Sequence, residues 1–402
     1  MAEVSISPRH SLAAPASSHE FRPQPFTGNS GWQVSAGGVA QEVRRLATLY
    51  SVRHLMSPSA RIVWVIGLLG PLAILASCTD SPTEPRTDMR EKRRQPDAWL
   101  AQLLTDGSDA AAYPILVGAG DIARCYPGSD VTAMVPASET PAAATARLLD
   151  RIPGTVMAVG DNAYEFGSPF DYASCYEPTW GRHRSRTQPA AGNHEYLTPD
   201  AAGYFAYFGA AAHPETNGYY SYEIGSWHVV VLNSTPQWAL CPPLPPRSSA
   251  AQGRLCAGDV AQRLWLTADL AAHPALCTVA YFHHPRYSSG THGNQYEMQQ
   301  FWDILYRAGV DIVVSGHDHD YERFAPQNAD DRLDLVRGVR EFVVGTGGAE
   351  PRSFGAPVPN SQVRISGRHG VLALALGSGR YGWAFVTTQG TIADLGGGMC
   401  HA

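Results

Sequence analysis

Residues 155–164 read TVMAVGDNAY, an apolar run followed by a glycine and polar residues. The run has the length and composition of a buried parallel strand. Gly160 then lets the backbone turn sharply, which brings Asp161 to the carboxyl end of that strand. Because ligand sites in open α/β sheets lie at these carboxyl ends, Asp161 is a candidate site residue.

The same arrangement recurs at four other places in the chain. Each place adds a polar residue after an apolar segment: Asp121 in GAGD, Asn193 and His194 in GNHE, His283 in FHHP, and His317 and His319 in SGHDH. Asp, Asn and His offer the oxygen and nitrogen atoms that divalent and trivalent metal ions bind. Five such segments together predict a metal site, whereas a single one would indicate only a turn or a strand cap.

Several other classes of protein do not fit this sequence. It contains neither a GxSxG elbow nor a GxxxxGK[ST] loop, so it indicates neither serine hydrolysis nor P-loop chemistry. The 402 residues are 44% hydrophobic and 16% charged, which is typical of one large packed α/β domain with accessory segments. The formal net charge of −6 does not favour a nucleic-acid-binding surface.

Apolar periodicity predicts alternating strands and helices through the middle of the chain. We expect helices at 138–151, 260–272 and 296–307, and strands at 219–224, 228–233, 278–282 and 311–315. This β-α-β alternation predicts a largely parallel or mixed sheet. After residue 340 come strands at 341–344, 371–375, 383–387 and 391–393, which predict a second, β-rich sheet packed on the first.

The N-terminal part differs in composition from the rest. An apolar run at 62–76 follows Arg61 and ends in LASC, which resembles a bacterial lipobox. The resemblance implies a lipoprotein signal peptide at 56–77, a lipid on Cys78 and export to the cell envelope, facing the periplasm or the outer surface. A membrane anchor that stays attached is the alternative. Residues 1–55 then represent either a start assigned too early, with translation from Met56, or a disordered extension; 78–112 form a tether, and 113–402 form the globular domain.

Cysteine usage agrees with export. Beyond Cys78 the chain has six cysteines, and an even number in an exported protein indicates disulfides. We expect the pairs Cys241–Cys256, Cys125–Cys175 and Cys277–Cys400, although closeness in sequence favours only the first.

Read as blocks, the polar segments resemble the five motifs of the calcineurin-like metallophosphoesterase superfamily: GD(IA), GDNAY, GNHE, HHP and GHDHDYER. Tyr164 in GDNAY narrows the resemblance to the purple acid phosphatase branch, and the closing DLGGGMCH resembles bacterial members. The resemblance covers residues 113–402, the catalytic domain. It implies an α/β fold, a four-layer αββα sandwich of two mixed β-sheets with the metals at one edge.

The resemblance also implies a binuclear metal centre. The first ion, Fe(III) in the family, would be held by Asp121, Asp161, Tyr164 and His319. The second, a divalent Fe, Zn or Mn, would be held by Asp161, Asn193, His283 and His317, with Asp161 as the bridge. Two catalytic histidines are implied: His194 as the substrate-binding acid, and His292, nine residues after His283, as a second substrate-binding residue.

The function implied by the resemblance is hydrolysis of small-molecule phosphate monoesters, in which a metal-bound hydroxide attacks phosphorus and phosphate is released. A phosphodiesterase or nucleotidase on the same centre is the first alternative, and a non-catalytic surface lipoprotein is the second. The basic segment at 182–186 is either a phosphate-attracting rim or a solvated loop.

Overall fold

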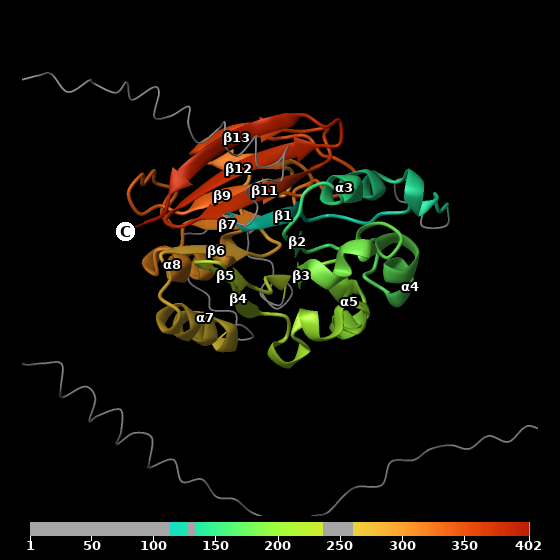
Figure 1. The fold of residues 1–402 in the computed structure, drawn as a ribbon, viewed down its shortest axis with the longest axis horizontal. Helices are drawn as coiled ribbons and strands as arrows, with labels where there is room; N and C mark the ends of the chain where they lie inside the picture. Colours follow the sequence, from blue (N-terminus) through green and yellow to red (C-terminus); the bar gives the residue numbers. More distant parts are fainter. Residues whose placement is uncertain (1–112, 127–132, 236–259, 402) are drawn as a thin grey trace, which may run out of the picture. The chain divides into compact units, whose positions relative to one another are not determined.

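The computed structural model describes residues 113–126, 133–235 and 260–401 (Figure 1). The predictions for residues 1–112, which include the signal peptide, the Cys78 lipidation site and the tether, lie outside the described residues, as does the expected Cys241–Cys256 pair. In the part of the chain that is described, no helix is long and apolar enough to cross a membrane.

Two mixed β-sheets form the centre of the domain. The first has the order β13-β12-β11-β1-β2-β3, with bounds β1 Ile115–Ala119, β2 Thr155–Val159, β3 Thr187–Ala190, β11 Gly370–Gly377, β12 Arg380–Thr387 and β13 Ile392–Met399. The second has the order β10-β8-β9-β7-β6-β5-β4, with bounds β4 Tyr220–Ile224, β5 Trp227–Val231, β6 Cys277–Tyr281, β7 Ile312–Ser315, β8 Tyr321–Phe324, β9 Arg340–Val344 and β10 Ser361–Ile365.

Parallel pairing decides where the strand ends lie. In the first sheet β1, β2 and β3 are parallel, and in the second β5, β6, β7 and β9 are parallel. Main-chain hydrogen bonds also join the two sheets at the carboxyl ends: Gly120 N donates to Val344 O (2.9 Å), and Gly347 N donates to Gly120 O (2.9 Å). The residues that follow β1, β2, β6 and β7 are therefore brought to one edge.

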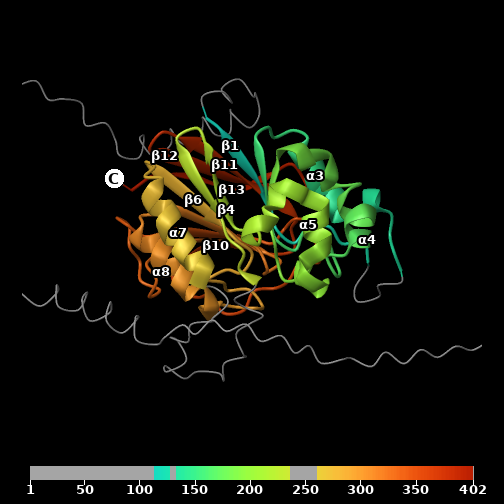
Figure 2. The same ribbon diagram turned by 90° about the horizontal axis from the view of Figure 1, so that it is seen from below.

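Helices pack beside both sheets. Figures 1 and 2 show α7 (Val260–Ala272) and α8 (Gln299–Arg307) side by side over the second sheet, while α3 (Pro141–Leu149), α4 (Pro169–Asp171) and α5 (Ala202–Phe208) gather beside β1–β3. The predicted spacing on α8 is confirmed, because Phe301, Trp302 and Leu305 are fully buried in a core shared with the strands below. A larger core lies between the sheets. The predicted αββα arrangement of two mixed sheets is thus the observed one.

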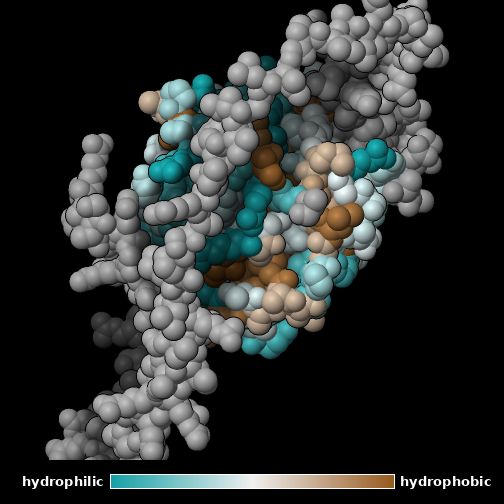
Figure 3. Space-filling view, turned by 90° about the vertical axis from the view of Figure 1, so that its left-hand side faces the viewer, coloured by the Kyte–Doolittle hydropathy of each residue, from teal (hydrophilic) through white to brown (hydrophobic). Residues whose placement is uncertain are grey.

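The helix expected at 138–151 begins as a 3₁₀ turn and becomes α-helical only at Pro141. Thr140 caps it, since its hydroxyl oxygen accepts from Ala143 N at 3.4 Å. On one face of the described part, shown in Figure 3, hydrophilic and hydrophobic residues are interspersed. This is normal for a domain whose large apolar side chains fill two internal cores.

One prediction about the C-terminal third is wrong. Its strands do not form a separate second sheet: β11 pairs with β1 in the first sheet and β9 pairs with β7 in the second, so the C-terminal strands are divided between the two sheets. Apolar runs predict strands but carry no information about which partner a strand will choose. Strands β3, β8 and β10 were not predicted. Strand β13 is longer than expected and includes Gly396 and Gly398, where the Trp383 and Tyr381 rings leave no room for a side chain.

Two of the three expected disulfides are present. Cys125 pairs with Cys175, and Cys277 pairs with Cys400 across 123 residues of sequence. The second bridge fastens the end of β13, in the first sheet, to the start of β6, in the second. It therefore holds the two sheets together at the edge opposite the candidate site.

We predict that replacing both Cys277 and Cys400 with Ala lowers the free energy of unfolding by about 2–4 kcal/mol, because the unfolded chain regains the freedom that a long closed loop removes. Urea unfolding under non-oxidising, non-reducing conditions measures the change. An unfolding curve that coincides with that of the unmodified chain would contradict the prediction.

Candidate metal centre

Three residues after strand ends have an unusual backbone conformation. Asp121, Asp161 and His317 have φ values of 58°, 48° and 70°, in the left-handed region that non-glycine residues rarely occupy. Such a conformation persists only where neighbouring contacts hold it, and it clusters at functional sites. One such contact joins two of these residues, since His317 N donates to Asp121 Oδ2 at 2.8 Å. The strained turns direct these side chains toward one another.

The four residues predicted for the first metal ion lie together. The Tyr164 hydroxyl is 2.8 Å from Asp121 Oδ1, 3.2 Å from Asp161 Oδ2 and 3.3 Å from His319 Nε2. The other nitrogen of His319 is fixed by the carbonyl of Glu350 at 2.8 Å. All four side chains are buried. The four side chains thus offer carboxylate and phenol oxygens and one imidazole nitrogen as possible metal ligands.

Two of the residues predicted for the second ion, His283 and His317, lie together beside Asp161. His283 Nε2 is 3.1 Å from Asp161 Oδ2 and 3.3 Å from His317 Nδ1. His283 Nδ1 lies 3.0 Å from the carbonyl of Val159, which orients the ring. Asn193 Oδ1 is buried and has no hydrogen-bond partner among the described residues. A buried polar atom without a partner is costly, and a metal ion would supply the missing contact.

The charges in this group depend on one another. Burial alone would raise the pKa of Asp161, but the neighbouring His283 and His194 outweigh it and hold that pKa well below its ordinary value. Burial, reinforced by both aspartates, raises the pKa of Tyr164 well above its ordinary value, so the phenol keeps its proton. Burial and three neighbouring imidazoles lower the pKa of His317, which leaves it neutral, as a metal ligand must be.

This donor set fits a pair of metal ions. One ligand atom each of Asp121, Asp161 and His283 lie within 4.8 Å of one another, and so do those of His283, His284 and His317. Carboxylate, amide and imidazole groups suit Fe, Zn and Mn, and a shared carboxylate suits two ions close together. His284, the second histidine of its block, has Nδ1 2.9 Å from the Ser234 hydroxyl.

Glu195 organises the centre without facing it. Its carboxylate accepts from the amides of Asp161 (3.0 Å), Asn162 (2.8 Å) and Gly192 (2.7 Å), and from the Tyr172 hydroxyl (3.2 Å). It therefore joins the GDNAY and GNHE loops. Gly192 has no room for a side chain, since a Cβ there would collide with Asp161. Glu195 is the last residue of the GNHE motif, but no sequence pattern indicated that its side chain binds another loop.

His194 faces the shared carboxylate. Its Nδ1 lies 2.6 Å from the carbonyl of Glu165, and its Nε2 lies 3.9 Å from Asp161 Oδ2. Burial works against a charged imidazole here, but the Asp161 carboxylate and the Glu165 carbonyl outweigh it and raise the pKa of His194. A proton on Nε2 would point into the centre.

His292 reaches the same place from a different loop. Its ring stacks on that of His317, with centroids 4.2 Å apart and planes 28° apart. Its amide donates to Asp318 Oδ1 at 2.9 Å, and the Ser288 hydroxyl donates to the same carboxylate. Asp318, which separates the two predicted ligand histidines in sequence, therefore binds this loop through its carboxylate.

Arg352 is a functional candidate that the sequence analysis missed. Its guanidinium contacts His292 Nε2, and its amide donates to the carbonyl of His319 at 3.0 Å. Burial, reinforced by the charge of Arg352, lowers the pKa of His292 although Asp318 opposes the change. The sequence does contain an apolar run that ends at residue 344, and the segment after that run precedes Arg352. Because β9 is parallel to β7, this segment also comes to the edge where the site lies.

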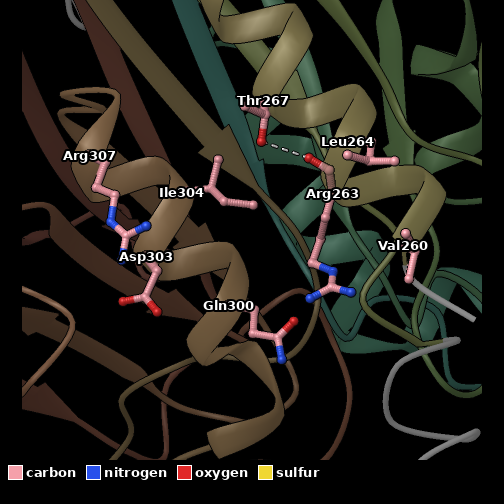
Figure 4. Close-up of a pocket in the computed structure, with 8 residues that line it drawn as sticks. All are labelled: Val260, Arg263, Leu264, Thr267, Gln300, Asp303, Ile304 and Arg307. Atoms are coloured by element: carbon pink, nitrogen blue, oxygen red, sulfur yellow. Dashed lines mark hydrogen bonds between the residues drawn. The ribbon is translucent and has the colours of Figure 1, made fainter. Parts of the chain in front are cut away.

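The basic segment at 182–186 does not supply this rim. Arg182 pairs with Asp150 (2.7 and 2.8 Å), and Arg186 donates to the carbonyls of Gly154 and Leu149 (2.6 Å each). These bonds fasten the segment to the end of α3. A separate hollow between α7 and α8, lined by residues such as Arg263, Asp303 and Arg307, belongs to the outer helical layer and contains none of the predicted ligands (Figure 4).

Comparison with known proteins agrees with this geometry. The calcineurin-like phosphoesterase family model matches residues 120–321, half of the chain, and the chain therefore belongs to this family. Family membership implies a binuclear metal centre. The family and the fold predicted from the motifs are confirmed.

Purple acid phosphatases are among the relatives. The chain is 27% identical over 177 residues to purple acid phosphatase 22 of Arabidopsis thaliana, and 31% identical over 124 residues to acid phosphatase A of Cryphonectria parasitica. These matches cover 38% and 30% of this chain, and 37% and 25% of the relatives, so the chain spans less than half the length of either.

A solved structure shares the fold. GAP50, described as the anchor in the inner membrane complex of Plasmodium, superimposes with a TM-score of 0.50 at 13% identity, over 72% of this chain and 90% of that chain. At this identity the likeness concerns the fold alone. This structural similarity is therefore no evidence for catalysis, which depends on the residues of the site.

We predict that Glu195→Gln weakens both the fold and the centre. An amide nitrogen would replace an oxygen that accepts from main-chain donors, leaving buried N–H groups unsatisfied at about 1–3 kcal/mol. Urea unfolding of the metal-free chain and the metal content after loading measure the two effects.

The matched control is Glu139→Gln, at an exposed position. Equal stability and metal content in the two variants would show that Glu195 does not organise the loops.

Proposed function

We propose that this chain hydrolyses phosphate monoesters at a binuclear metal centre and releases inorganic phosphate. The observation that most supports the proposal is the position of Asp161 Oδ2, 3.2 Å from the Tyr164 hydroxyl and 3.1 Å from His283 Nε2. One carboxylate thus faces both groups of donors, as a bridging ligand must.

Each group would hold one ion. Asp121, Asp161, Tyr164 and His319 suit Fe(III), because a trivalent cation between two carboxylates would displace the phenolic proton that Tyr164 otherwise keeps. Asp161, Asn193, His283 and His317 suit a divalent Fe, Zn or Mn. When bound, such a pair of ions supplies Lewis acidity toward phosphate oxygens and activates water near neutral pH.

His194 is proposed as the acid for the leaving group. With Nδ1–H donated to the Glu165 carbonyl, the ring holds Nε2 toward the centre, where a proton can pass to the departing alcohol oxygen. General acid catalysis of this kind contributes about 10²–10⁴-fold. The position of His194 beside Asp161 supports this role, since proton donor and shared ligand face the same space.

His292 and Arg352 are proposed to bind the phosphate rather than to donate the proton. A guanidinium is always charged and can bind two phosphate oxygens through its planar donors. Its contact with His292 disfavours a second positive charge there. A fixed cation at the rim favours a dianionic monoester over a monoanionic diester, and this distinguishes the proposal from the phosphodiesterase alternative.

For the whole protein we propose an exported lipoprotein anchored through Cys78. The two disulfides among the described residues support an oxidising compartment. The proposed domain order is a signal peptide at 56–77, a tether at 78–112 and the catalytic domain at 113–402.

We predict that the metal-loaded full chain turns over an aryl phosphate monoester faster than the matched diester, and that Asp161→Asn reduces this activity at least about 100-fold, because both ions lose their shared ligand. Steady-state release of the aryl alcohol measures both rates.

Asp330→Asn, at an exposed position, is the control and should retain activity. Faster diester turnover would favour the phosphodiesterase alternative. No turnover of either ester by a chain that binds two metal ions would contradict the enzymatic proposal and favour a surface binding protein.

We further predict that Arg352→Ala raises KM for the monoester about tenfold with a smaller change in kcat, since the guanidinium binds the phosphate oxygens in the ground state as well. Arg352→Lys should restore part of the affinity, because it keeps the charge without the planar fork. Arg337→Ala, at an exposed position away from these contacts, serves as the control. An unchanged KM in Arg352→Ala would remove Arg352 from the site.

A further inference from the structure

A second cluster of imidazole and carboxylate groups lies where the β4–β5 hairpin meets the end of α7. It consists of His228 on β5, Asp269 on α7 and His273 just after α7, and one ligand atom from each lies within 4.8 Å of the other two. It is separate from the centre described above. His228 pairs in register with Thr278, and five residues of extended chain, about 16 Å, separate Thr278 from His283.

The aspartate lies between the two histidines. Asp269 Oδ2 is 2.9 Å from His228 Nε2, and Asp269 Oδ1 is 3.2 Å from His273 Nδ1. The two rings are nearly parallel, with centroids 5.0 Å apart and planes 14° apart. Asp269 and His273 are four residues apart, the spacing that places two ligands on one face of a helix.

Each residue of the cluster also has a hydrogen-bond partner besides the contacts given above. His228 Nδ1 is 2.7 Å from Glu223 Oε1, and His273 Nδ1 is 2.9 Å from the main-chain carbonyl of Asp269. The Ser221 hydroxyl donates to Asp269 Oδ1 at 2.7 Å. Metal-binding histidines almost always donate their second ring N–H to a carboxylate or a carbonyl, which fixes the ring and frees the other nitrogen. His228 has such an acceptor in Glu223, which leaves Nε2 facing Asp269, whereas in His273 the same Nδ1 lies near both the carboxylate and the carbonyl of Asp269.

Burial makes the arrangement unusual for a simple surface ion pair. His228 is 1% exposed and Asp269 is 8% exposed, while the His273 side chain is half exposed. An imidazolium at His228 between Asp269 and Glu223 would account for that histidine alone. It would not account for a second imidazole stacked on the first and turned toward the same carboxylate. A bound cation accounts for both.

We propose that His228, Asp269 and His273 form a binding site for a divalent transition metal ion, of which Zn²⁺ is the representative. Two imidazole nitrogens and one carboxylate oxygen suit Zn²⁺, whereas Ca²⁺ and Mg²⁺ require oxygen ligands. Three protein ligands leave a fourth position, which the half-exposed His273 opens to water. The ion would tie the β4–β5 hairpin at the edge of the second sheet to the helix that covers it. This proposal does not rest on the phosphatase activity.

The test is zinc stoichiometry of the full chain, with Zn²⁺ alone as the probe, by equilibrium dialysis. His273→Gln is the main variant because its side chain is half exposed and its loss should leave the fold intact. We expect this variant to bind one zinc ion fewer per chain than the unmodified protein, through a loss of affinity at this site of at least about 100-fold. That is more than the loss of an outer hydrogen-bond partner costs. Hydrolytic activity should be unchanged.

His213→Gln is the matched control. His213 also pairs with a carboxylate, with Nδ1 3.0 Å from Glu215 Oε1, but it is not part of a metal-binding cluster in the described part of the chain. It should bind as much zinc as the unmodified chain, and His273→Cys, which keeps a zinc ligand, should recover the lost ion. Equal stoichiometry in all variants would overturn the proposal, and an equal loss in His213→Gln and His273→Gln would assign the zinc to scattered surface histidines.

Discussion

The candidate centre depends on a single carboxylate that faces two ways. Asp161 Oδ2 is within hydrogen-bonding distance of both a phenol and an imidazole, while its Oδ1 accepts from the amide of His194 and its own amide is held by Glu195. The aspartate can occupy this position only in a left-handed conformation, after a glycine at the end of β2. Three glycines pack closely against Asp161 and Asp121. A methyl group at any of these positions would collide with a carboxylate: Gly192, Gly316 and Gly345. The geometry is therefore fixed by the absence of side chains as much as by their presence.

The pKa values of the two proposed substrate-binding histidines shift in opposite directions, a difference that the residue types alone do not reveal. His194 lies against a carboxylate and a carbonyl, which favour its protonated form, whereas His292 lies against a guanidinium, which disfavours it. The family resemblance implied substrate binding for both residues. Their difference arises from partners on other loops, Glu165 in one case and Arg352 in the other.

The strand-end rule singled out candidate residues that the fold brings to one edge, because the rule depends only on local sequence and on the parallel arrangement of neighbouring strands. Asp121, Asp161, His283 and His317 could be found this way, since each directly follows an apolar run. Glu195 could not, because its role is to accept main-chain hydrogen bonds from a loop more than thirty residues earlier, and no pattern records that. Arg352 was missed for a different reason: the rule was not applied to β9, which had been assigned to a separate sheet. Because β9 was placed in the wrong sheet, Arg352 was left out of the predicted site residues.

The pairing of β1 with β11 has a consequence for how the centre can be assembled. Every proposed metal ligand lies between residues 121 and 319, yet β1 is flanked on one side by a strand that begins at Gly370, and β7 by one that begins at Arg340. A nascent chain that has just emerged past His319 carries every proposed ligand, but β9 and β11, the later strands that pair with β7 and β1, have not yet been made. Strands β11 and β9, which flank β1 and β7, are therefore synthesised after every proposed ligand, so the sheets can close beside these two strands only once the last part of the polypeptide has been made.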